Sequence, residues 1–153
     1  LLLASCVTER KGNQPQAGPQ PQTVVVGKVW IAATPPQDTD VNGYFDTVDL
    51  TIYLFGHNYP ASLIIPGEFK FDLVSKSAPN DKPFATWSVS KEAAAASTGS
   101  SAVGPFYSIR LSLLDRGGDN FPDQTADIVA VFTPTAGAPV REVVTVRIGK
   151  LRS

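Results

Sequence analysis

Hydrophobic and polar residues alternate with a period of two in several short segments of the chain after residue 24. In residues 47–55, Val48, Leu50, Ile52 and Leu54 fall on one face, because successive side chains of a β-strand point to opposite sides. Six further apolar or alternating segments, bounded by turn residues, are expected to be strands: residues 24–33, 69–74, 84–89, 106–114, 125–133 and 141–148. The pattern predicts seven strands.

Two shorter segments depart from this pattern. Residues 63–65 are a candidate for a short edge strand. Residues 93–96 are four consecutive alanines, which favour a helix and resist a strand. Ser90 is suited to cap the N-terminus of such a helix, and the Thr-Gly-Ser of residues 98–100 is suited to end it. The sequence therefore predicts one short helix over residues 91–96.

Seven short strands with turns between them and one short helix indicate an all-β fold. We expect a two-sheet antiparallel β-sandwich over residues 24–153. The arrangement resembles immunoglobulin-like or C2-like domains in architecture only, since the single Cys excludes the Cys–Trp–Cys pattern of true immunoglobulin domains. A fold of this kind does not define a function.

Composition narrows the classes of function. The 153 residues include 42% hydrophobic and 18% charged residues, enough for one domain with a core. The net charge of −1 and the absence of a recognition motif argue against nucleic-acid binding. The chain has one Cys and one His. A single Cys excludes a disulfide within the chain, and two residues are too few ligands for a zinc site built from Cys and His.

The N-terminal segment Leu3-Ala4-Ser5-Cys6 resembles the lipobox of bacterial lipoproteins, in which the Cys carries a diacylglycerol and becomes the first mature residue. The resemblance implies that residues 1–5 are the remnant of a signal peptide and that Cys6 anchors the protein to a membrane. Val7 replaces the Asp that retains such proteins at the inner membrane, so the resemblance favours the outer membrane of the cell envelope. The alternative is a hydrophobic Cys without a role.

Residues 6–23 are expected to be a flexible, lipid-anchored linker. Residues 8–23 read TERKGNQPQAGPQPQT, with four Gln, three Pro and no hydrophobic period. Extended, this segment reaches roughly 50 Å. The folded domain would then stand away from the membrane.

The first acidic loop, residues 38–49, reads DTDVNGYFDTVD. Oxygen-bearing side chains occupy positions 1, 3, 5, 9 and 12, and Gly43 occupies position 6, which resembles the calcium loops of EF-hands and dockerins. The resemblance implies that calcium is held by side chains, by water and by the carbonyl of residue 44, from this set: Asp38, Asp40, Asn42, Tyr44, Asp46 and Asp49.

The loop departs from that family in two ways. Its closing residue is Asp49 and not the bidentate Glu, and strands rather than helices are expected on both sides. These departures favour a static, stabilising calcium site over a sensor. The alternative is a solvated turn in which Asp and Asn cap the backbone and Gly43 takes a positive φ.

The second acidic loop, residues 115–127, is a weaker candidate for a metal site. Its acids are Asp115, Asp119, Asp123 and Asp127. The two loops together hold eight of the 14 acidic residues, and clustered carboxylates repel one another unless a cation or hydrogen bonds compensate them. Every connection reverses an antiparallel chain, so both loops are expected at the same end of the sandwich, unless residues 63–65 form a further full strand.

No catalytic constellation accompanies these loops. His57 lies in a predicted turn without a nucleophile motif nearby, so we predict that the protein is not an enzyme. Trp30 and Trp87 suit the core, but an exposed Trp beside a groove would suit sugar stacking. The sequence predicts a lipid-anchored binding or structural module with an envelope protein or glycan as partner; the alternative is a carbohydrate-binding or carbohydrate-processing accessory domain.

Overall fold

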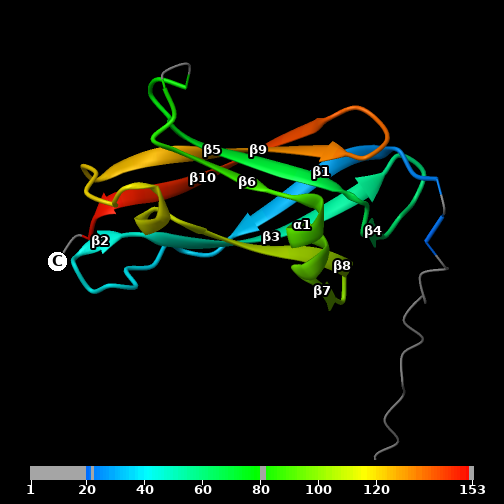
Figure 1. Cartoon of the computed structure of the whole chain (residues 1–153), viewed down its shortest axis with the longest axis horizontal. Helices are drawn as coiled ribbons and strands as arrows, with labels where there is room; N and C mark the ends of the chain where they lie inside the picture. Colours follow the sequence, from blue (N-terminus) through cyan, green and yellow to red (C-terminus); the bar gives the residue numbers. More distant parts are fainter. Residues whose placement is uncertain (1–19, 22, 80–81, 152–153) are drawn as a thin grey trace, which may run out of the picture.

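The computed structural model describes residues 20–21, 23–79 and 82–151. Two antiparallel sheets face each other (Figure 1). The hydrophobic core is formed by buried side chains of both sheets. The predicted all-β fold, with two antiparallel sheets and one short helix, is confirmed. The proposed lipid-attachment residue Cys6, the signal-peptide remnant and most of the linker lie outside the described residues.

Each sheet has five strands, and all neighbouring strands are antiparallel. The first sheet has the order β1-β3-β8-β7, with β4 also pairing with β3: β1 (Val26–Ala33), β3 (Thr47–Gly56), β8 (Gly104–Ser112), β7 (Thr98–Ser101) and β4 (Ser62–Leu63). The second has the order β2-β10-β9-β5-β6: β2 (Tyr44–Phe45), β10 (Val140–Lys150), β9 (Gln124–Pro134), β5 (Gly67–Ser75) and β6 (Ala85–Val89).

The structure has ten strands rather than the predicted seven. All seven predicted strands are present, and the other three are β2, β4 and β7, each of two to four residues. β4 (Ser62–Leu63) overlaps the candidate edge strand of residues 63–65 at Leu63, whereas β2 and β7 were not predicted. Segments this short show no measurable period, so pairing with a neighbour defines them. Helix α1 (Lys91–Ala96) has the predicted bounds, and the Ser90 hydroxyl accepts a hydrogen bond from the Ala93 amide. A 3₁₀ turn, η1 (Leu114–Arg116), opens the second acidic loop.

Aromatic side chains join the two sheets in the core. The ring of Phe69 on β5 lies 4.7 Å from that of Phe132 on β9 and 5.1 Å from that of Tyr107 on β8. The buried Tyr107 hydroxyl donates to the Ile65 carbonyl and accepts from the Ile65 amide, at 2.7 and 2.8 Å. Burial raises the pKa of Tyr107. This residue therefore ties the segment before β5 to the opposite sheet.

The two tryptophans differ in burial. Trp87 on β6 belongs to the core, as expected, and its indole N–H donates to the Ser112 carbonyl at 3.1 Å. Trp30 on β1 is 46% exposed. The expectation that both indoles belong to the core is thus confirmed for Trp87 and wrong for Trp30.

The loops that flank β1 lie at opposite ends of the sandwich. Val26 pairs with Gly56 at one end and Ala33 with Leu50 at the other, where the acidic loops follow (Figure 1). At the end where β1 begins, the Gln20 side-chain amide donates to the Ile64 carbonyl and accepts from the Ile64 amide. None of the helices within the described ranges is long and apolar enough to cross a membrane.

Candidate metal site

Three carboxylates of the first acidic loop come together at one end of the sandwich, which we call the acidic pole. Asp38, Asp40 and Asp46 each place one carboxylate oxygen within 4.8 Å of the others. The chain between them turns at Val41, whose φ of 61° is rare for a β-branched residue, and at Gly43, whose φ is 89°. A turn of this kind persists only when surrounding interactions fix it.

Hydrogen bonds to Asp38 and Asp40 help to hold the turn at Val41 and Gly43. Asp38 accepts from the backbone amides of Asn42 and Gly43 at 3.1 and 2.8 Å, and Asp40 accepts from the Asn42 amide at 3.3 Å. Desolvation, together with the charges of Asp119 and Asp46, raises the pKa of Asp40 despite the Asn42 amide. Desolvation is the main cause of the raised pKa, and the neighbouring carboxylates add to it.

Asp46 is the buried member of the group, only 1% exposed. Its carboxylate accepts from the Thr39 amide at 2.6 Å, from the Thr39 hydroxyl at 2.8 Å and from the Asp40 amide at 3.3 Å. Burial by itself would raise the pKa of Asp46, but hydrogen bonds from the Thr47 and Thr39 hydroxyls and the two amides outweigh it and lower the pKa. Asp46 therefore braces the loop, and most of its acceptor capacity is already used.

One carboxylate of the second acidic loop is linked to this group through Asn42. The side-chain amide of Asn42 donates to Asp40 and to Asp119, at 3.0 Å each, and Asp119 is 5% exposed. The Leu113 amide donates to the Asp46 carbonyl at 2.7 Å. The expectation that both acidic loops share one pole is confirmed by these contacts.

Asp49 lies away from the group. It belongs to β3, and the alternation of that strand places it opposite Arg110 on the outer face of the first sheet. The Arg110 guanidinium donates to both Asp49 oxygens, at 2.7 and 2.9 Å, and holds the pKa of Asp49 below its ordinary value. The predicted closing ligand is thus occupied by an ion pair.

The remaining predicted residues have other surroundings. Asp115 is exposed in η1, the Asp123 carboxylate pairs with Arg147 at 2.6 Å, and Asp127 accepts from the Thr145 hydroxyl at 2.7 Å. Tyr44 lies in β2, and its amide donates to Asn42. Of the acids of the second loop, Asp119 is joined to the predicted calcium loop by the Asn42 side chain.

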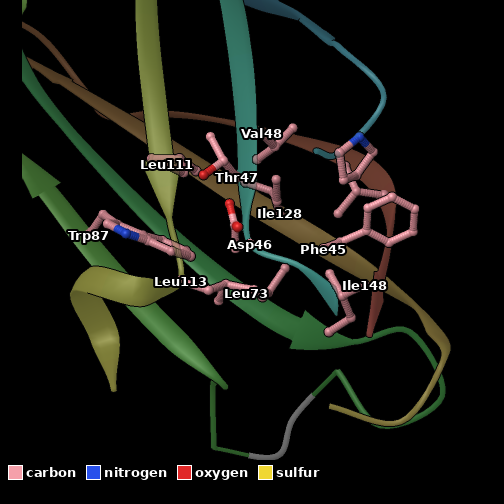
Figure 2. Close-up of a pocket in the computed structure, with 12 residues that line it drawn as sticks. Phe45, Asp46, Thr47, Val48, Leu73, Trp87, Leu111, Leu113, Ile128 and Ile148 are labelled. Atoms are coloured by element: carbon pink, nitrogen blue, oxygen red, sulfur yellow. The ribbon is translucent and has the colours of Figure 1, made fainter. Parts of the chain in front are cut away.

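A small hollow lies between the sheets beneath the loop, and Figure 2 shows Asp46 beside it among apolar side chains. Its volume is about 20 Å³, and its lining includes Leu73, Trp87, Leu111 and Ile128. A space of this size holds at most about one water, and an apolar lining offers such a water few partners. The hollow is a packing gap and not a substrate pocket.

The chemistry of the acidic pole fits a hard divalent cation. Its side-chain donors are all oxygen, which calcium prefers. In the part of the chain that the structure describes, the ion pairs formed by Asp49, Asp72 and Asp123 all lie outside the group. Asp38 and Asp40 keep more unused acceptor capacity than Asp46, so they suit direct coordination best.

The chain has no match among protein-family models, curated proteins or solved structures. Its site is therefore defined by its own geometry. That geometry adds Thr39, which the predicted ligand set omitted and which fixes Asp46. The available signal was the position of Thr39 between two loop acids, since Thr side chains commonly bond nearby loop groups.

Proposed function

We propose that this protein is a non-enzymatic, lipid-anchored module of the cell envelope, with a β-sandwich stabilised by calcium at the acidic pole. The observation that supports calcium is the convergence of Asp38, Asp40 and Asp46, joined by Asp119 through Asn42. Folding brings these like charges together, and a divalent cation would offset their repulsion.

Asp38 and Asp40 would hold the ion, with Asp119 adding negative charge from the second acidic loop. Asp46 would act indirectly, because its hydrogen bonds to Thr39 and Asp40 set the shape of the loop. Calcium would supply positive charge between two loops that are 77 residues apart at the Asn42–Asp119 bond. This role is structural, in keeping with extracellular sites of about 10⁻⁴–10⁻³ M affinity.

Thermal unfolding in calcium and in chelator tests this part of the proposal. For a site in that affinity range, 10 mM calcium should stabilise the fold by about 1.4–2.7 kcal/mol, or roughly 3–10 °C in Tm. Asp38→Asn should abolish the shift, and Asp115→Asn, which changes an exposed acid of the other loop, should preserve it. Equal melting temperatures in calcium and chelator would contradict the proposal.

The lipid anchor is supported by the lipobox-like Leu3-Ala4-Ser5-Cys6 and the polar segment that follows it. Two acyl chains on Cys6 would bury many methylenes at about 0.8 kcal/mol each, enough for stable attachment. Because β1 begins at the end opposite the acidic loops, an anchor at Cys6 would direct the acidic pole away from the membrane. The outer membrane is the proposed location.

Mass spectrometry of protein extracted from native membranes tests the anchor independently of calcium. A diacylglycerol-modified Cys6 at the mature N-terminus is expected. Cys6→Ala should move the protein from the membrane fraction to the soluble fraction. A free Cys6 thiol in the membrane-extracted protein would refute the anchor.

A carbohydrate-binding accessory domain is the second candidate function. The exposed indole of Trp30 on a sheet face favours it, whereas Trp87 lies in the core. We also propose that the strand arrangement is immunoglobulin-like or C2-like, which is compatible with either function. Loss of binding to glycans on removal of Trp30 would separate the two candidates.

A further inference from the structure

We infer that the outer face of the first sheet binds a neutral, β-1,4-linked polysaccharide chain, with Trp30 as its principal stacking residue. This inference rests on the second candidate function, carbohydrate binding, and names its ligand. It is independent of the calcium site and of the lipid anchor.

An aromatic row crosses three strands of this face. Trp30 on β1 is the register partner of Tyr53 on β3, with ring centroids 5.3 Å apart. Phe106 on β8 lies 5.7 Å from Tyr53 on its other side, and Phe55 stacks on Tyr53 at 6.5 Å. Four rings therefore form one connected cluster around Tyr53, which we call the aromatic face.

The aromatic face is held in place by packing and by one hydrogen bond. Tyr53 is only 7% exposed, and its hydroxyl lies 3.1 Å from that of Ser101 on β7. Gly99 allows the Phe106 ring to lie against β7, since a Cβ at Gly99 would be 2.6 Å from that ring. Trp30, at 46% exposure, thus presents its indole from a fixed support, which lowers the entropy lost on binding.

Polar side chains lie beside the aromatic face, two residues further along the strands. Thr51 on β3 pairs with Ser108 on β8, and the Asp49–Arg110 pair follows on the same face. A pyranose ring has an apolar C–H face and a rim of hydroxyls. The aromatic rings match the C–H face, and the neighbouring hydroxyl, carboxylate and guanidinium groups match the rim.

The low charge of the aromatic face favours a neutral ligand. Asp49 and Arg110 neutralise each other there, which leaves the exposed Lys28 as the other charged side chain on the outer side of β1, β3 and β8. The outer face of the second sheet carries more charged residues: Lys70–Asp72, Asp123–Arg147, Asp127 and Arg141. Trp30 alone of the four rings is strongly exposed, so the apolar area is small for a stable protein interface, which buries about 800 Å² per partner. β-1,4 linkages with equatorial bonds give a flat chain whose C–H faces suit this surface.

Titration with cellohexaose and the fully N-acetylated chitohexaose, both uncharged, followed by tryptophan fluorescence and calorimetry, tests the inference. Saturable binding with a change in Trp emission is expected, because Trp30 is exposed and Trp87 is buried. Trp30→Ala should weaken binding at least about tenfold, as removal of a central aromatic residue commonly does. Trp30→Phe should retain part of the affinity. Val143→Ala, at a 37% exposed position on the other sheet, should change nothing.

Absence of binding to both oligosaccharides, or equal binding by wild type and Trp30→Ala, would overturn the inference. Light scattering tests whether a second copy of the chain occupies the aromatic face instead. A wild-type dimer that becomes monomeric in Trp30→Ala would make this face a self-association surface and overturn glycan binding. The calcium-dependent Tm shift is measured on the same proteins. If that shift persists while glycan binding is absent, only this inference fails, and the proposed calcium site stands.

Discussion

The two acidic loops carry four Asp each, but the carboxylates of the two loops have different surroundings. In the first, Asp38, Asp40 and Asp46 converge within 4.8 Å. In the second, Asp123 and Asp127 are bound by Arg147 and Thr145 of the neighbouring strand β10, and Asp119 turns toward the first loop. Density of acids along the sequence therefore does not define a site; the partners that the sheet supplies decide which carboxylates stay available.

The loops also differ in what holds their backbones. The first acidic loop is organised around a buried carboxylate, Asp46. The second lies against Gly149 of β10, whose φ is 93° and whose missing Cβ leaves room for the Pro122 carbonyl. One loop depends on hydrogen bonds to an acid and the other on a close backbone approach, and each can be broken separately.

The largest effect is expected for Gly149→Ala. The added Cβ would collide with the backbone of Phe121 and Pro122 and would strain a left-handed conformation, at a cost of about 3 kcal/mol or more. Gly117→Ala is the matched control, because its φ is 102° but nothing lies within 4 Å of the added atom; about 1 kcal/mol is expected. Urea unfolding measures both. Equal losses would show that the close approach is unimportant.

Asp46→Ala is expected to destabilise the fold by about 2–3 kcal/mol. The change leaves the Thr39 and Asp40 amides and the Thr39 hydroxyl without their acceptor. Asp115→Ala, in the second loop and exposed, should stay within about 0.5 kcal/mol of wild type in the same urea experiment. A loss for Asp46→Ala no larger than that of Asp115→Ala would refute the bracing role.

Low pH should lower the stability of the folded protein, because protonation of Asp46 removes its contribution. Its folded pKa lies below the ordinary value of 3.8, so its contribution is fully present above that pH and disappears as pH falls through the folded pKa. Asp46→Asn should therefore give a flatter decline of stability below about pH 4 than wild type. Denaturant midpoints measured from pH 6 to pH 2.5 provide the comparison, and parallel curves would contradict the assignment.

The smallest effect is expected for the Asp49–Arg110 pair. It is a bidentate but partly exposed ion pair, so a double-mutant cycle of Asp49→Ala and Arg110→Ala should give a coupling of about 0.2–1 kcal/mol that falls with salt. Neither change should alter the calcium-dependent Tm shift. Loss of that shift in Asp49→Ala would return Asp49 to the ligand set.

Period-two alternation, apolar runs and turn residues were sufficient to predict the seven long strands, and the reversal of the chain at each connection predicted that both loops share one pole. The alternation also contained an unused signal: Asp49 alternates with Val48 and Leu50, so it belongs to the outer face of β3 and not to a loop. The bond between Asp49 and Arg110 spans 61 residues, and local spacing holds no information about it. The register between β3 and β8 determines which residues form such a pair.

The exposure of Trp30 also could not be predicted from the sequence. Its segment is apolar nearly throughout, so the hydrophobic pattern does not tell inward from outward positions. In the structure, the register between β1 and β3 shifts between Val26 and Lys28, and Lys28 and Trp30 both lie on the outer face. A bulge of this kind changes which residues face solvent without marking the sequence clearly.

The claim that calcium binds the first acidic loop is tested most directly by amide chemical shifts during a calcium titration of the ¹⁵N-labelled protein. The account predicts saturable changes at Thr39, Asp40, Asn42 and Gly43 and a linked change at Asp119, with small effects at Asp115 and Asp127. Asp40→Asn should reduce all of them. A spectrum that calcium leaves unchanged, or changes confined to residues 115–118 and 123–127, would contradict it.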